Sequence, residues 1–145
     1  MARLASQAKT TELIRERALT IVGFVAEKNY RGEIDRLFTW VRDHIRYTRD
    51  VNGVETVQTP RKTLEYAQGD CDDQSTLLAS LLESVGIQTR FKAVGFSPGQ
   101  FQHVYLEARD DSQQPPRWVA LDPTERVPMG WEPPNPVSVM TQPVF

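Results

Sequence analysis

The sequence predicts an α+β fold in which helices occupy the first part of the chain and an antiparallel sheet follows. Up to Gly86, apolar residues recur at the spacing of amphipathic helices. Beyond Gly86 the apolar segments are short and rich in Val, Phe, Tyr and Trp, and turn residues separate them. Because helices and strands are segregated along the chain, we expect the last helix to pack on one face of the sheet.

Two amphipathic helices are expected between residues 1 and 49. The first follows Thr10 and Thr11 and is expected to stop at Gly32, after which the second continues to near Tyr47. Charged residues lie between the apolar ones, as they do on the solvent face of such helices. The apolar positions are Leu13, Ile14, Ala18, Ile21, Val22 and Val25 in the first helix, and Ile34, Leu37, Phe38, Val41 and Ile45 in the second.

The next segment is expected to be a loop followed by a short helical turn. Residues 50–59 contain Asn52-Gly53, which is a strong turn dipeptide. Pro60 can then open a helical turn that extends through Tyr66, because proline is favoured at the first position of a helix.

A third main helix is expected to begin at Cys71. Asp70 is placed to act as its N-cap, and Gly86 follows where a helix C-terminus favours glycine. This helix is apolar enough to be the central helix of the core, through Leu77, Leu78, Leu81, Leu82 and Val85.

Three sequential antiparallel strands are expected after this helix, at residues 88–96, 102–108 and 117–121. The segment 123–145 contains six prolines, which forbid a continuous helix and disfavour a central strand. It is therefore expected to be an extended tail that wraps over the domain.

The composition limits the classes of function. The 145 residues are 39% hydrophobic and 25% charged, as in an ordinary globular domain, and the net charge is −2 with dispersed Lys and Arg, which disfavours nucleic-acid binding. No stretch of about 18 apolar residues occurs, so no membrane span is expected. Cys71 is the single cysteine, and a lone thiol is typical of a reducing compartment, so a cytoplasmic location is expected.

Cys71, His103 and Asp122 form the candidate catalytic set. A helix N-terminus favours the thiolate form that attacks acyl carbons, and an imidazole is needed to take the thiol proton. The two histidines are His44, on the polar side of a helix, and His103, early in a strand, which is the better candidate. Asp122 ends the next strand, where a carboxylate can fix the imidazole tautomer.

Structural roles compete with these assignments. A lone cysteine is more often a small buried hydrophobe, but Gly-Asp-Cys-Asp-Asp is too polar for a core segment. The acidic run Asp70, Asp72 and Asp73 is better explained by helix capping than by a metal site, and paired zinc ligands are missing. These acids oppose the helix dipole at the sulfur, so His103 is expected to supply much of the activation.

Three blocks of the sequence carry a resemblance to a known family. They are GDCDDQSTLLASLLESVGIQTRFKAVGF, FQHVYLEA and RWVALDPTE. Together they resemble the transglutaminase-like superfamily, which has the papain-like cysteine protease fold, over about residues 45 to 125. The resemblance implies Cys71 as nucleophile, His103 as base and Asp122 as the orienting group. It also implies a small single-domain member, since there is no room for the flanking β-domains of animal transglutaminases and no calcium loop.

The remaining site residues are less defined. The Cys71 backbone N–H is one expected oxyanion donor, and Gln68, Tyr66 or Tyr47 is expected near the second. Tyr105 shares the strand face of His103 and is expected to line the pocket, whereas Trp118 is expected in the core. A further hypothesis is that residues 129–136 border the cleft. No metal and no cofactor is expected.

Three functions remain open. The first is hydrolysis of an amide or peptide bond through a thioester, as in a protease, amidase or deamidase, and the second is transfer of the acyl group to an amine. The third is a binding or structural role on the same fold, such as a phage accessory protein. The expected partner is a protein or peptide substrate rather than nucleic acid or membrane. The expected organisation is one domain over residues 1–145, with N-terminal helices at 1–49, a catalytic core at 60–122 and a Pro-rich C-terminal tail at 123–145.

Overall fold

A computed structural model of the chain describes residues 1–23, 25, 28–49 and 57–144. The helices are α1 (Ala2–Ala8), α2 (Glu12–Val22), α3 (Tyr30–His44), α4 (Pro60–Tyr66) and α5 (Cys71–Ser84). The strands are β1 (Arg46–Tyr47), β2 (Gln68–Gly69), β3 (Thr89–Gly95), β4 (His103–Asp110), β5 (Arg117–Leu121) and β6 (Ser138–Pro143). The described helices all precede the strands of the main sheet, β3 to β6, and the α+β prediction is confirmed.

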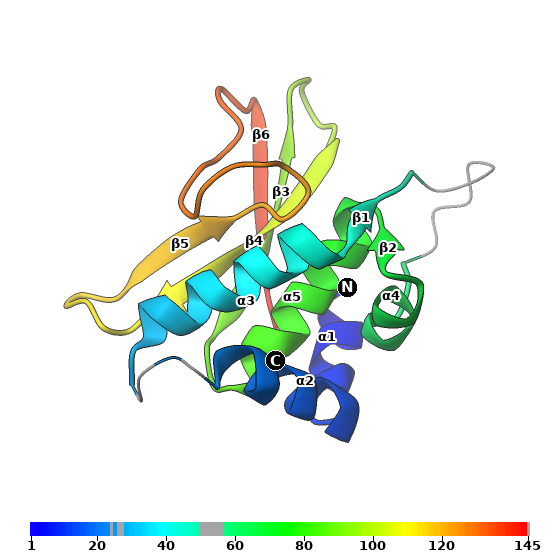
Figure 1. Cartoon of the computed structure of the whole chain (residues 1–145). Coiled ribbons are helices and arrows are strands. Elements are labelled where there is room, and N and C mark those ends of the chain that lie inside the picture. The colour runs from blue at the N-terminus through cyan, green and yellow to red at the C-terminus, as the bar shows by residue number, and fades with distance from the viewer. Residues whose placement is uncertain (24, 26–27, 50–56, 145) are drawn as a thin grey trace.

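The main sheet has the strand order β5-β4-β3-β6, and all neighbouring strands are antiparallel. The three sequential strands β3, β4 and β5 are those predicted. β6 was not predicted as a strand, because its segment is rich in proline. It lies at the edge of the sheet beside β3, where strands containing proline are tolerated, and the chain between β5 and β6 arches over the sheet (Figure 1).

The helix boundaries differ from the prediction in the first third of the chain. α1 was not expected, and Gly32, predicted to end a helix, lies inside α3. The reason is the capping of α3 by Asn29, whose side chain accepts a hydrogen bond from the Gly32 N–H at 3.1 Å. A Cβ atom at position 32 would lie 2.6 Å from the Asn29 side chain, so glycine makes room for the cap.

Tyr47, the predicted end of the second helix, lies instead in β1, a two-residue strand that pairs in parallel with β2. The predicted turn at Asn52-Gly53 falls outside the described residues. The helical turn that opens at Pro60 is confirmed as α4.

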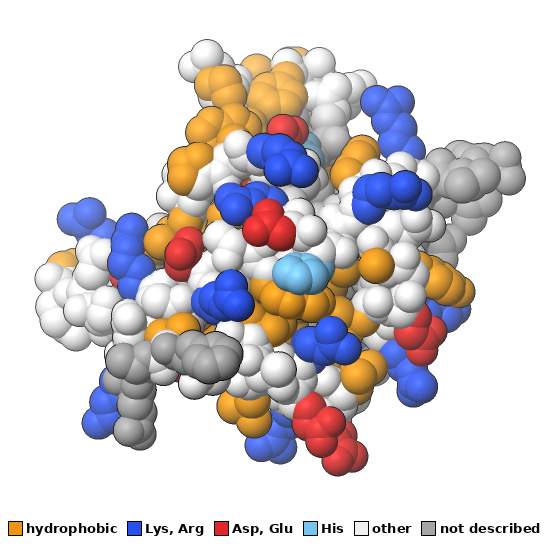
Figure 2. Space-filling view, in the orientation of Figure 1, with side chains coloured by type: hydrophobic (Ala, Val, Ile, Leu, Met, Phe, Trp, Pro, Cys, Tyr) orange, Lys and Arg blue, Asp and Glu red, His pale blue; other side chains and the backbone are white. Residues whose placement is uncertain are grey.

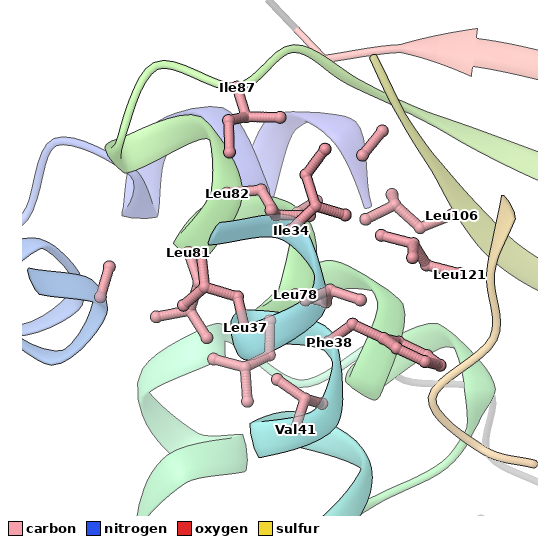
Figure 3. Close-up of a cluster of buried hydrophobic side chains, with 14 of the residues drawn as sticks. Ile34, Leu37, Phe38, Val41, Leu78, Leu81, Leu82, Ile87, Leu106 and Leu121 are labelled. Atoms are coloured by element: carbon pink, nitrogen blue, oxygen red, sulfur yellow. The ribbon is translucent and has the colours of Figure 1, made fainter. Parts of the chain in front are cut away.

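α5 is the central helix of the core, as predicted. It packs against α3 on one side and against the sheet on the other (Figures 1 and 3). Because it is enclosed, several of its polar side chains are buried as well, and some of these bond to nearby backbone; the Ser80 hydroxyl, for example, donates to the Leu77 carbonyl at 2.7 Å. The labelled core residues in Figure 3 are Ile34, Leu37, Phe38, Val41, Leu78, Leu81, Leu82, Ile87, Leu106 and Leu121.

No helix among the described residues is long and apolar enough to cross a membrane. On the face shown in Figure 2, basic, acidic and apolar side chains are interspersed.

Candidate active site

Cys71 is the first residue of α5, the position predicted from the sequence. Asp70 is the N-cap, and its carboxylate accepts from the Asp73 N–H at 3.0 Å, while the Asp73 carboxylate accepts from the Asp70 N–H at 3.1 Å. This reciprocal capping box fixes the first turn of the helix, which begins at Cys71, where the helix dipole favours negative charge. The capping role predicted for Asp70 is confirmed.

Two glutamines bind the residues on either side of Cys71. Gln58 donates to the Asp73 carboxylate from its backbone N–H at 2.7 Å and from its side chain at 2.8 Å. Gln74, which is buried, donates from Nε2 to the Gly69 carbonyl at 3.1 Å. Sequence reasoning missed both residues; the position of Gln74 one helical turn after Cys71 was the available signal.

His103 and Asp122 are brought together by the pairing of β4 with β5. Leu106 of β4 pairs with Leu121 of β5, so Asp122 follows directly beyond the paired segment, and its Oδ2 lies 2.7 Å from Nε2 of His103. Its other oxygen accepts from Thr124, at 3.2 Å from the backbone N–H and at 2.8 Å from the hydroxyl. The carboxylate is completely buried and held at both oxygens, so its orientation is fixed.

Cys71 also acts on the His103 imidazole through its charge. Because Nε2 is bonded to Asp122, the ring nitrogen left for the sulfur is Nδ1. Burial lowers the pKa of His103, but the hydrogen bonds and charges of Asp122 and Cys71 outweigh it and raise this pKa from 6.5 to about 10. The site therefore favours an imidazolium at neutral pH.

Cys71 and His103 line one cavity of about 370 Å³. Cys71 is partly exposed, so its sulfur can be reached from this cavity. The polar part of the wall includes Asp72, whose carboxylate lies 3.9 Å from the Cys71 sulfur. The other lining residues are Met1, Tyr47, Arg49, Asp70, Ala93, Phe101, Gln102 and Val104.

Tyr105 supports His103 from the side rather than lining this cavity. The two rings have centroids 6.0 Å apart, and the Tyr105 hydroxyl donates to Glu132 at 2.7 Å. Lys92 also reaches Glu132, at 2.6 Å. Burial and the neighbouring carboxylates, chiefly Glu132, raise the pKa of Tyr105, so it stays a hydrogen-bond donor.

The proline-rich segment therefore reaches the side of His103 where Tyr105 packs. Glu132 is its contact there, and none of the described residues at 129–136 lines the cavity, which differs from the hypothesis that this segment borders the cleft. Trp118, expected in the core, is half-buried, and the Arg90 guanidinium lies over its ring at 4.2 Å.

The fold separates the three residues that were expected near the second oxyanion donor. Tyr47 lines the cavity, and burial together with the charge of Cys71 raises its pKa. Tyr66 is 58% exposed on α4 and does not line the cavity. Gln68 does not line it either; its side-chain oxygen accepts from Arg46 at 3.2 Å.

His44 does not line this cavity, which agrees with the preference for His103 as the catalytic histidine. Its Nδ1 lies 2.8 Å from the Trp40 carbonyl, and its ring stacks on the Trp40 indole. Among the residues that the structure describes, no group of three His, Cys, Asp or Glu side chains could hold a metal ion.

Several solved structures share this fold. A protein from Cytophaga hutchinsonii provisionally named a cysteine protease has a TM-score of 0.60 and 18% identity over 89% of this chain and 42% of its own. LapG from Legionella pneumophila has a TM-score of 0.58 and 15% identity over 95% of this chain and 82% of its own. Rad4–Rad23 bound to a 6-4 photoproduct lesion has a TM-score of 0.57 and 9% identity over 87% of this chain and 37% of its own.

At these identities the likeness is one of fold, and the chain spans less than half the length of the Cytophaga protein. A search of curated proteins by sequence found no match. The family model described as the transglutaminase-like superfamily matches residues 9–123, which include Cys71, His103 and Asp122. The chain therefore belongs to the transglutaminase-like superfamily.

Proposed function

We propose that this protein is a cysteine-dependent acyl-transfer enzyme that cleaves amide or peptide bonds through a thioester on Cys71. The observation that carries this proposal is that His103 lines the same cavity as Cys71, while its Nε2 lies 2.7 Å from the buried Asp122 carboxylate. That arrangement matches the nucleophile, base and orienting group of acyl-transfer enzymes.

The reaction begins when the Cys71 thiolate attacks the carbonyl carbon of the substrate. The carbonyl oxygen gains negative charge, which the N–H groups at the start of α5 can stabilise. The C–N bond then breaks, His103 gives its proton to the departing amine, and a thioester remains on Cys71. The buried Asp122 carboxylate keeps the imidazole oriented throughout.

The second half releases the acyl group. His103, now neutral, takes a proton from water, and the hydroxide formed attacks the thioester carbon. The C–S bond breaks, the acid is released, and the thiolate with its imidazolium partner is restored. Water is the proposed acceptor because the cavity is open to solvent, so hydrolysis ranks ahead of transfer to an amine, in which an amine takes the place of water.

The proposed substrate is a protein or peptide, and the proposed location is the cytoplasm, where a lone thiol stays reduced. A binding role on the same fold is the alternative, since fold alone does not establish activity. It predicts that Cys71 has no special reactivity.

Brief alkylation separates these proposals. Intact-protein mass spectrometry after limiting iodoacetamide at pH 7 would compare the wild type, His103→Ala and the unfolded wild type. His44→Ala is the matched control, because its ring lies outside the cavity of Cys71. Native alkylation faster than that of the unfolded chain, and dependent on His103 but not on His44, supports the enzyme. Alkylation no faster than in the unfolded chain would favour the binding protein.

An active thiol would then be offered peptide amides with and without an added primary amine. Release of the free acid supports hydrolysis, whereas an amide formed with the added amine would show that transfer competes with water.

A further inference from the structure

The cavity of Cys71 continues into two others along the seam between α1 and the sheet edge formed by β3 and β6. The second cavity, of about 290 Å³, shares Met1, Ala93 and Val104 with the first. The third, of about 330 Å³, shares Ala2, Arg3 and Gln142 with the second. Since neighbouring cavities share lining residues, they lie side by side along a groove that starts at the candidate nucleophile.

The middle part of this groove is apolar. We name it the α1–β6 groove and define it by Met1, Ala2, Phe91, Ala93, Val104 and Met140, with Arg3 and Gln142 at its outer end. The pairing of β3 with β6 sets Phe91 opposite Gln142 and Ala93 opposite Met140, so these side chains share the sheet face turned toward α1. By contrast, the wall around Cys71 includes Arg49, Asp70 and Asp72.

Met140 is the most exposed apolar side chain of the α1–β6 groove. It is 52% exposed, although methionine loses favourable burial when it faces water. Methionine is also flexible and adapts to differently shaped apolar partners. An apolar group placed in the groove would cover Met140 and the small side chain of Ala93 beside it.

We propose that the α1–β6 groove binds a bulky apolar side chain of a peptide substrate whose reacting carbonyl lies at Cys71. The proposal rests on the acyl-transfer function proposed above and adds the substrate class. The position of the groove beside Cys71 indicates the occupant. A peptide whose carbonyl is held at Cys71 must leave the cavity along one of its walls, and the wall formed by Met1, Ala93 and Val104 leads to the apolar side chains of the α1–β6 groove. Burial of the side chain there supplies binding free energy that a polar side chain lacks.

β6 contains its own matched control. Val139 and Met140 are adjacent and each is 52% exposed, but successive residues of a strand point to opposite faces, and only Met140 lines the groove. Met140→Lys and Val139→Lys therefore place the same charge on the same edge strand, in the groove and outside it.

The test uses three alkylating probes of increasing reach: iodoacetamide, iodoacetyl-Ser-Ser-amide and iodoacetyl-Leu-Leu-amide. In each, the Cys71 sulfur displaces iodide, and intact-protein mass spectrometry gives the second-order rate. We expect the dileucine probe to react about tenfold or more faster than the diserine probe with the wild type and with Val139→Lys. With Met140→Lys the dileucine and diserine probes should react at similar rates.

Equal rates for the two peptide probes in the wild type would overturn the proposal. So would an equal loss of the dileucine preference in both lysine variants, because the effect would then arise from the strand and not from the groove. Failure of the proposed function looks different, since iodoacetamide itself would then react no faster with the native protein than with the unfolded chain.

Discussion

The imidazole Nε2 of His103 lies 2.7 Å from Oδ2 of Asp122, and this contact links the first residue of β4 to the residue that follows β5. It leaves the other ring nitrogen for Cys71 and stabilises the charged ring. A protonated ring beside the sulfur is what a thiolate requires, so the reactivity of Cys71 should depend on a carboxylate that does not line the cavity.

Asp122→Asn tests this dependence. The amide keeps the shape of the side chain but removes its charge, so the pKa of His103 should fall from about 10 toward its ordinary value of 6.5. Alkylation of Cys71 by iodoacetamide at pH 7 should slow about tenfold or more, while Cys71→Ala abolishes it. NMR titration of the His103 ring gives the first quantity and mass spectrometry the second. An unchanged His103 titration in Asp122→Asn would refute the coupling.

The same contact makes the free energy of unfolding depend on pH. The pKa of His103 is about 10 in the folded protein against 6.5 as its ordinary value, so the protonated ring favours the folded state. This contribution is complete below pH 6.5, declines as the pH rises through the interval, and is lost above about 10. Urea unfolding of wild type and His103→Gln should therefore differ most at pH 6 and least at pH 10. A difference that grew with pH would contradict the raised pKa.

Much of this arrangement could be predicted from the sequence, for reasons that particular residues make clear. The helix that begins at Cys71 could be predicted because three local signals indicate the same helix: the N-cap Asp70, the leucine spacing and Gly86 after its end. His103 and Asp122 could be placed together because sequential antiparallel strands lie side by side. The strand β6 could not be foreseen, since its pairing with β3 is a long-range contact that overrides the local preference of a proline-rich segment.

The failures at the site have a similar cause. Tyr105 was correctly assigned to the strand face of His103, but Glu132, which accepts a hydrogen bond from its hydroxyl, lies 27 residues away in a segment without periodicity. No spacing rule connects them. Gly32 was misread because a glycine within a helix looks like a break unless the capping Asn29 is considered with it.

Tyr105 should act on His103 through its ring more than through its hydroxyl. Tyr105→Phe removes the bond to Glu132 and should lower the free energy of unfolding by about 1 kcal/mol, with little change in the alkylation rate of Cys71. Tyr105→Leu also removes the ring beside the imidazole and should slow alkylation about tenfold. Chemical unfolding and mass spectrometry measure the two effects. Equal alkylation rates in both variants would show that the ring does not position His103.

Gly69 should be required for the position of α5. A Cβ atom at this residue would lie 2.6 Å from Cβ of Asp73, inside the capping box, so Gly69→Ala must displace either β2 or the first turn of the helix. We expect a loss of about 1–3 kcal/mol in the free energy of unfolding together with slower alkylation of Cys71. Gly86→Ala is the control for a glycine away from the site, because a Cβ there meets nothing within 4 Å and only its positive φ of 86° is strained. It should lower stability without slowing alkylation.

Asp72 should restrain the reactivity of Cys71. Its carboxylate lies 3.9 Å from the sulfur, and a negative charge at that distance repels a thiolate by about 1 kcal/mol even at the dielectric constant of water. Asp72→Asn should therefore speed alkylation by iodoacetamide about fivefold at low salt, and added salt should narrow the gap between variant and wild type. Asp111→Asn, which removes a carboxylate paired with Arg109 far along the sheet, should leave the rate unchanged. If Asp72→Asn instead slowed the reaction, the carboxylate would be helping to hold the thiol in place, and its charge would not be the quantity that matters.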